Sequence, residues 1–251
     1  MENSFSVFEV LQTAWDITRK NLLVLMGYSA VASLITFLLV PTAHFYIASS
    51  DNSLLKFIGL PILLVITSFL TLGFYKLIFK IIDNESDDDI DFNNIIPSWK
   101  NVSSFISLWL MYSVLMVIIT LIYGKLLSVN EFALLVRTIK STPFLIEILS
   151  FIAFIILVLA IVRFMFFPCF IVDDNSSSFE SLRQSRELTF HNLTRIITVL
   201  LLVIGFIVIG FLALGVGIIV TYPFTNVILV VTYRKLVYSY GVEHPSEQLL
   251  H

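Results

Sequence analysis

Long apolar stretches constrain this chain more than any other feature of its sequence. Five of them occur, at residues 22–41, 57–75, 102–124, 144–172 and 196–233. Only the fourth contains charged side chains, Glu147 and Arg163. A helix needs ~20 apolar residues to cross the ~30 Å hydrocarbon core of a bilayer. The pattern therefore predicts several membrane-spanning helices.

The amino-acid composition excludes several classes of protein. Charged residues make up 13% of the 251 residues, about half of the ~25% found in soluble chains. The net charge of -3 gives no basic surface for nucleic acid. A single cysteine, Cys169, excludes a disulfide framework and a CxxC metal site. An ordinary soluble enzyme, a disordered tail and a nucleic-acid-binding protein are therefore all excluded.

The apolar stretches favour helices, because strands of a membrane barrel would alternate polar and apolar residues. As one helix, residues 196–233 would be ~57 Å long, nearly two bilayers. We expect this stretch to fold back near residues 215–217, with Pro223 bending the returning helix. The predicted fold is therefore all-α: a polytopic membrane protein with six transmembrane helices. The six helices would form a single integral membrane domain, residues 1–251.

Basic residues predict the sidedness of the chain, because cytoplasmic loops are enriched in Lys and Arg. With the N-terminus inside, ten basic residues fall on the cytoplasmic side and four on the outer side. The N-terminus has no basic region or cleavage site of a signal peptide, so the first span is expected to be retained. The prediction is a multi-pass protein of the bacterial cytoplasmic (inner) membrane with both termini in the cytoplasm.

Two polar segments resemble each other. Residues 6–22, SVFEVLQTAWDITRKNL, align without a gap with residues 177–193, SSFESLRQSRELTFHNL. Each begins with Ser-x-x-Glu, the pattern of a capping box, and precedes two predicted spans. A weaker copy, residues 91–99, precedes the third span, although any polar segment entering a membrane needs a cap and an amphipathic turn. We expect three parallel helix-plus-hairpin repeats, about residues 4–82, 90–172 and 176–239.

The two similar segments are predicted to be cytoplasmic amphipathic helices that lie in the headgroup region. In the first, apolar side chains share one face and charged side chains the other. The second is more polar and is expected to lie shallower or to pack on protein. The side chains predicted to anchor these helices are Phe8, Leu11, Trp15, Phe179 and Leu182.

Arg163 is the candidate site residue within the spans. A charge at the centre of a spanning helix costs ~2.5–3.5 kcal/mol, so Arg163 needs a partner. It either binds an anionic lipid headgroup, forms a buried ion pair, or extends its side chain to the nearby interface. Glu147 is expected to lie at a solvated helix start.

No catalytic or metal site is predicted. The acidic segment 83–91 lacks the glycine and glutamate of a calcium loop. The four histidines are scattered, and no H-E-x-x-H motif is present. We therefore predict no enzymatic activity, no metal and no cofactor.

The second half of the chain resembles a family of membrane proteins. An arginine ends a span and is followed by an acidic residue and a helix with the pattern S-x-x-L-T-x-x-N. A span that contains glycines comes next, and the last helix combines a proline with aromatic residues. This order is similar to the uncharacterised YciC-type bacterial inner-membrane proteins and to the membrane domain fused to some glycerophosphodiester phosphodiesterases. The matching positions are Arg163, Asp173, Ser185, Leu188, Thr189, Asn192, Gly215, Pro223 and Tyr233. The resemblance implies an inner-membrane protein and carries over no catalytic activity.

The sequence thus favours a non-catalytic inner-membrane protein that acts as a membrane scaffold or lipid-engaging module. The alternative is a small transporter or lipid translocator that uses a groove between the repeats. The expected partners are membrane lipids, with other membrane proteins or a second copy of the chain as further candidates. Nucleic acid is not expected.

Overall fold

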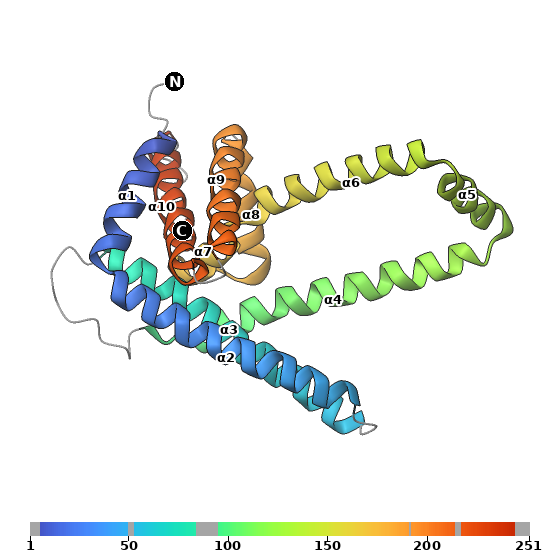
Figure 1. The fold of residues 1–251 in the computed structure, drawn as a ribbon, viewed down its shortest axis with the longest axis horizontal. Helices are drawn as coiled ribbons and strands as arrows, with labels where there is room; N and C mark the ends of the chain where they lie inside the picture. Colours follow the sequence, from blue (N-terminus) through green and yellow to red (C-terminus); the bar gives the residue numbers. More distant parts are fainter. Residues whose placement is uncertain (1–5, 50–52, 84–94, 191, 214–216, 244–251) are drawn as a thin grey trace.

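The computed structural model describes residues 6–49, 53–83, 95–190, 192–213 and 217–243. These residues form helices joined by short connections, and none of them lies in a β-strand. In chain order the helices are α1 (Val7–Lys20), α2 (Leu22–Ser49), α3 (Ser53–Asp83), α4 (Trp99–Leu127), α5 (Asn130–Ser141), α6 (Pro143–Phe164), α7 (Phe167–Asp173), α8 (Ser178–Phe190), α9 (Leu193–Leu212) and α10 (Ile218–Glu243) (Figure 1).

Within the described residues, five segments are long and apolar enough to cross a membrane. They are Leu22–Ala43, Pro61–Asp83, Trp99–Leu127, Pro143–Asp173 and Leu193–Leu212. The all-α fold is therefore confirmed, and five of the predicted spans have the length and composition of membrane helices. The sixth, α10, is not among these segments; it contains Pro223, Asn226, Arg234 and Lys235.

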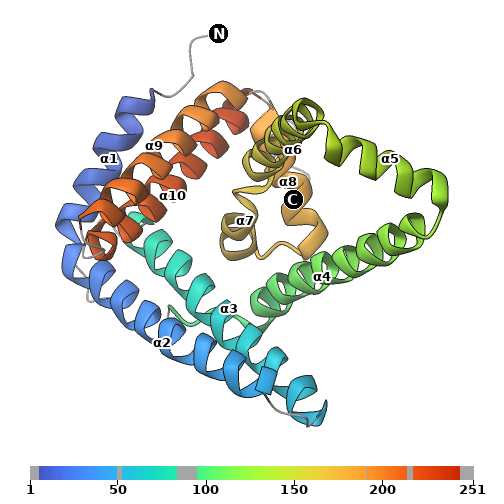
Figure 2. The same cartoon turned by 45° about the vertical axis from the view of Figure 1, so that its right-hand side comes forward.

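The core lies where α3, α7 and α10 meet. Leu77 and Ile78 of α3 pack with Val227 and Ile228 of α10, and all four are fully buried. Cys169 of α7 is buried in the same cluster. Helix α1 runs along the outside of α10, and α9 packs on α10 as well (Figure 2). Burying apolar surface at this junction holds together segments that are far apart in the sequence.

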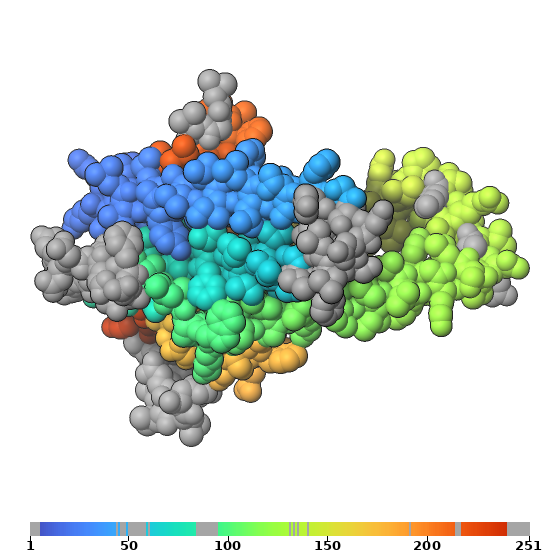
Figure 3. Space-filling model, turned by 90° about the horizontal axis from the view of Figure 1, so that it is seen from below, coloured from blue at the N-terminus to red at the C-terminus, as the bar shows by residue number. Residues whose placement is uncertain are grey.

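Helices α4, α5 and α6 extend away from this core. Helices α4 and α6 project to one side and are joined at their far ends by α5 (Figure 1). From Leu110 to Leu127 every side chain of α4 is exposed, and those of α6 are exposed over most of its length. Seen from below, α4 continues past α2 and α3 to the end of the molecule (Figure 3). Apolar surface on this scale indicates a membrane environment rather than water.

The uncharged stretch 196–233 folds back, as predicted. Helix α9 ends at Leu212 and α10 begins at Ile218, and the two helices pack together. Their backbones come so close that a Cβ on Gly217 would lie 2.9 Å from the Cα of Gly210. Glycine permits this approach because it has no side chain.

The fourth predicted span is broken near its end. Helix α6 ends at Phe164, and α7 begins at Phe167 with Pro168 in its first turn. Proline has no N–H to continue the hydrogen-bond ladder of α6, but it is tolerated where a helix begins. A further helix, α5, lies between the third and fourth spans and was not predicted.

The two similar polar segments both form short helices, α1 and α8, and each precedes two long helices. Glu180 accepts hydrogen bonds from the N–H and the hydroxyl of Ser177, at 3.3 and 3.4 Å. Ser6 precedes α1, but its side chain makes no capping hydrogen bond. Of the weaker copy, residues 91–94 lie outside the described residues; Ile95 is buried, and Ser98 caps α4 through the N–H of Asn101. The duplication and the three-repeat arrangement stay predictions.

Candidate functional site

Ser185 of α8 satisfies the backbone at the break between α6 and α7. Its hydroxyl donates to the carbonyl of Arg163 at 2.9 Å and accepts from the N–H of Phe166 at 3.3 Å. Ser185 is fully buried, so both contacts are shielded from solvent. A helix end leaves carbonyl and N–H groups without partners, and one hydroxyl here serves one group of each kind.

Arg163 is the last charged residue before this break, and its side chain lies against α8. Its Nη1 donates to the carbonyl of Arg186 at 3.4 Å, and its guanidinium lies 5.0 Å from the ring centre of Phe190. Among the described residues, no carboxylate forms an ion pair with Arg163. Guanidinium has five N–H donors in a planar fork, so most of its donors remain available to an acceptor from outside the protein.

A second polar cluster joins α3, α7 and α10. Nη2 of Arg234 lies 2.7 Å from Asp83 and 3.1 Å from Asp173, and its guanidinium stacks 4.8 Å from the ring centre of Phe79. The hydroxyl of Tyr233 donates to Asp173 at 3.0 Å. One arginine of α10 thus holds two carboxylates, Asp83 and Asp173, which are the last residues of α3 and α7.

These contacts bring together positions that carry the family resemblance. Arg163 meets Ser185 across the helix break, and Asp173 meets Tyr233 in the second cluster. Sequence reasoning did not predict either pairing. Nothing in the spacing along the chain indicates that Ser185 would turn toward α6 or that Arg234 would meet Asp83, since these contacts depend on how the helices pack.

The predicted anchoring residues fall into two groups. Phe8 and Phe179 are more than 70% exposed, whereas Leu11 and Leu182 are partly buried against the protein. Trp15 is 53% exposed, and its ring makes an edge contact with Phe224 of α10 at 5.7 Å.

Helix α1 is thus partly engaged with protein. It presents Val10, Ala14 and Thr18 to the interior, whereas Phe8 and Trp15 are exposed.

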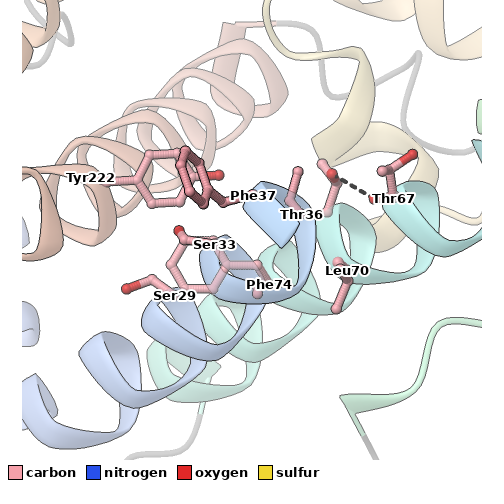
Figure 4. Close-up of a pocket in the computed structure, with 10 residues that line it drawn as sticks. Ser29, Ser33, Thr36, Phe37, Thr67, Leu70, Phe74 and Tyr222 are labelled. Carbon is pink, nitrogen blue, oxygen red and sulfur yellow. Dashed lines mark hydrogen bonds between the residues drawn. The ribbon is translucent and has the colours of Figure 1, made fainter. Parts of the chain in front are cut away.

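A pocket of about 430 Å³ lies between α2, α3 and α10 (Figure 4). Its described lining residues combine hydroxyl groups with aromatic rings, and none of them is charged: Ser29, Ala32, Ser33, Thr36, Phe37, Thr67, Leu70, Thr71, Phe74 and Tyr222. The sequence pattern did not predict this pocket, because its lining residues come from three different helices.

The other residues considered in the sequence, which are Glu147 and the possible metal ligands, form no catalytic or metal-binding arrangement among the described residues. Glu147 is exposed in the first part of α6, close to Pro143. In the described part of the chain, no group of three His, Cys, Asp or Glu side chains is placed to hold a metal ion. Most of the acidic segment 83–91 lies outside the described residues.

Comparison of the chain with protein-family models, with curated proteins and with solved structures finds no match.

Proposed function

We propose that this chain is a non-catalytic, six-span protein of the bacterial inner membrane that engages anionic lipid at Arg163. The observation that carries the proposal is the environment of this residue. Its guanidinium contacts one backbone carbonyl and one aromatic ring, and no carboxylate among the described residues neutralises it. A charge in such a place requires a counter-charge, and a lipid phosphate supplies one.

The position of Arg163 within its helix supports a phosphate at the cytoplasmic leaflet. Arg163 is the penultimate residue of α6, at the end that leads into α7 and the polar helix α8. The excess of basic residues on this side of the predicted topology also supports the cytoplasmic orientation. The planar guanidinium donates two parallel hydrogen bonds to a phosphate, a geometry that lysine lacks.

The exposed surfaces of α4 and α6 support a lipid-engaging role over a purely structural one. These helices separate from the core and are joined only through α5 at their far ends (Figure 2). Because their side chains are exposed around the helix, acyl chains rather than protein are expected to contact them on most sides.

The test is lipid retention by variants of Arg163. Protein purified from membranes containing phosphatidylglycerol is analysed by native mass spectrometry, together with its thermal unfolding temperature in detergent. We expect Arg163→Lys to weaken retention and Arg163→Leu to abolish it, with little change in stability. Arg183→Leu is the matched control, because Arg183 is 75% exposed and pairs with Glu187 in its own helix; retention should be unchanged.

Two outcomes contradict the proposal. If both Arg163 variants lose stability and keep their lipid, the protein groups around Arg163 are its true partners. If neither stability nor retention changes, Arg163 merely extends to the interface.

A further inference from the structure

The pocket between α2, α3 and α10 has a distinctive chemical lining, which is independent of Arg163. It lies within the membrane-spanning part of the proposed fold: Ser29 is seven residues into α2, ~10 Å along the helix from Leu22. Its volume of about 430 Å³ falls in the ~300–1,000 Å³ range of small-molecule sites.

Three hydroxyl groups of the pocket, those of Ser29, Thr67 and Thr71, are available as acceptors. The hydroxyl of Ser29, which is 3% exposed, donates to the carbonyl of Met26 at 3.1 Å. That of Thr67 donates to the carbonyl of Leu63 at 2.9 Å. That of Thr71 donates to the carbonyl of Thr67 at 2.8 Å, the bond that is dashed in Figure 4. Because each of these protons is used within its own helix, the oxygen lone pairs remain for a donor that enters the pocket.

The aromatic side of the pocket is fixed by stacking. The ring centres of Phe74 and Tyr222 lie 5.8 Å apart, and the rings are 10° from parallel. The ring of Tyr28 also stacks on Phe74, with the ring centres 5.4 Å apart. The hydroxyl of Tyr28 donates to the carbonyl of Leu70 at 3.0 Å, which holds this ring against α3. The result is a preformed apolar wall facing the acceptors.

The described lining disfavours charged ligands. Its residues include no Lys, Arg or His to pair with a phosphate, and no Asp or Glu to pair with an ammonium group. A charged group would lose its hydration within the membrane without gaining a counter-ion. An uncharged molecule with a hydroxyl donor and an apolar body matches both sides of the pocket.

We infer that this pocket binds an uncharged lipid alcohol. The alcohol O–H donates to the hydroxyl oxygen of Thr67 or of Thr71, and the chain lies against Phe74 and Tyr222. No covalent step is involved, and the inference holds whether or not Arg163 binds phospholipid.

The experiment uses the full chain in lipid nanodiscs and hexadecan-1-ol that carries a diazirine at mid-chain. After illumination, labelled peptides are mapped by mass spectrometry. We expect labelling of α2, α3 and α10 around the pocket, and competition by unlabelled hexadecan-1-ol but not by its methyl ether, which has no proton to donate.

Two pairs of variants refine the test. Thr71→Val keeps the shape of the side chain and removes an acceptor, and we expect about fivefold weaker competition, as for one neutral hydrogen bond. Thr198→Val is its control, because Thr198 makes the same type of bond, to Thr194 at 3.0 Å, outside the pocket. Ala32→Phe fills the pocket and should abolish labelling, whereas Ala30→Phe, on the exposed side of α2, should not.

Several results would overturn the inference. Equal competition by the methyl ether would show that the pocket accepts apolar chains without reading the hydroxyl. Stronger competition by hexadecylamine would identify a cation site instead. Labelling spread over the exposed faces of α4 and α6, or labelling unaffected by Ala32→Phe, would show partitioning into the lipid around the protein.

Discussion

Arg234 shows at the scale of single residues how burial decides the value of an ion pair. It contacts two carboxylates, but the side chain of Asp173 is 18% exposed and that of Asp83 is 56% exposed. Water replaces the lost partner of an exposed carboxylate more easily than that of a buried one. The two carboxylates are therefore not equivalent, although their distances to Arg234 are similar.

We expect Arg234→Met to lower the free energy of unfolding by ~1–3 kcal/mol, because it leaves Asp173 without its cation. Asp83→Asn should cost less than ~1 kcal/mol, since that carboxylate is mostly solvated. Adding Asp173→Asn to Arg234→Met should restore part of the loss. Denaturant unfolding in detergent micelles compares these three variants with the unmodified protein, and a larger cost for Asp83→Asn than for Arg234→Met would contradict this assignment.

The contact between Tyr28 and Gly73 is a second residue-scale feature. The Tyr28 hydroxyl occupies the space that a Cβ on Gly73 would need, so the tyrosine side chain must shift if residue 73 carries a Cβ. We expect Gly73→Ala to destabilise the α2–α3 pair by ~1–3 kcal/mol through overpacking. Tyr28→Phe added to Gly73→Ala should recover part of this loss, because it removes the obstructing oxygen.

Gly27→Ala is the control for this prediction. Nothing lies within 4 Å of a Cβ at Gly27, and alanine favours helix over glycine by ~1 kcal/mol. The thermal unfolding temperature should therefore fall for Gly73→Ala and stay the same or rise for Gly27→Ala. Equal shifts in the two variants would show that the close approach at Gly73 has no energetic weight.

At the scale of helices, α1 is attached to α10 by charge as well as by apolar contacts. Lys235 forms an ion pair with Glu9, and its hydrogen bond and positive charge lower the pKa of the Glu9 carboxyl. The Glu9 carboxyl therefore binds a proton less readily when α1 is packed on α10 than when α1 has separated from it. The pair therefore supports docking above the ordinary glutamate pKa, and this support is lost as pH falls through the lowered value.

Trp15 reports this docking, because its ring contacts Phe224 of α10. In a variant whose other two tryptophans are replaced by phenylalanine, we expect Trp15 emission to change as the pH is lowered from about 7 to about 3. The change should be small, since the Glu9 carboxylate is exposed to solvent, and should disappear in Glu9→Gln. Asp16→Asn, which alters a carboxylate with no ion pair among the described residues, should keep it; a transition that persists in Glu9→Gln would refute the role of this pair.

The helices themselves were largely predictable, and their contacts were not. Uncharged length predicted α2, α3, α4 and α9, and residues 196–233 were too long for one helix. The break before Pro168 was missed, because the apolar run continues through it without a change in composition. The two polar clusters depend on which helix faces lie together, and a pattern along one helix does not specify its neighbours.

The whole molecule differs from a simple bundle of six helices. A tightly packed junction of α1, α3, α7, α8, α9 and α10 adjoins helices that extend with little protein around them (Figure 1). The proposed site at Arg163 and the pocket beside Tyr222 both lie where long helices meet this junction. The depth of both sites in the membrane depends on whether α10 crosses the bilayer. The central claim is therefore that α10 is a membrane-spanning helix.

Accessibility of introduced cysteines on either side of α10 tests this most directly. In a Cys169→Ser protein expressed in intact cells, single cysteines replace Ala213, at the end of α9, and Tyr238, near the end of α10; both native residues are exposed. The six-span account predicts that a membrane-impermeant maleimide labels position 213 in intact cells, and position 238 only after the membrane is opened. Labelling of both positions from the same side would show that α10 does not cross the membrane and would contradict the account.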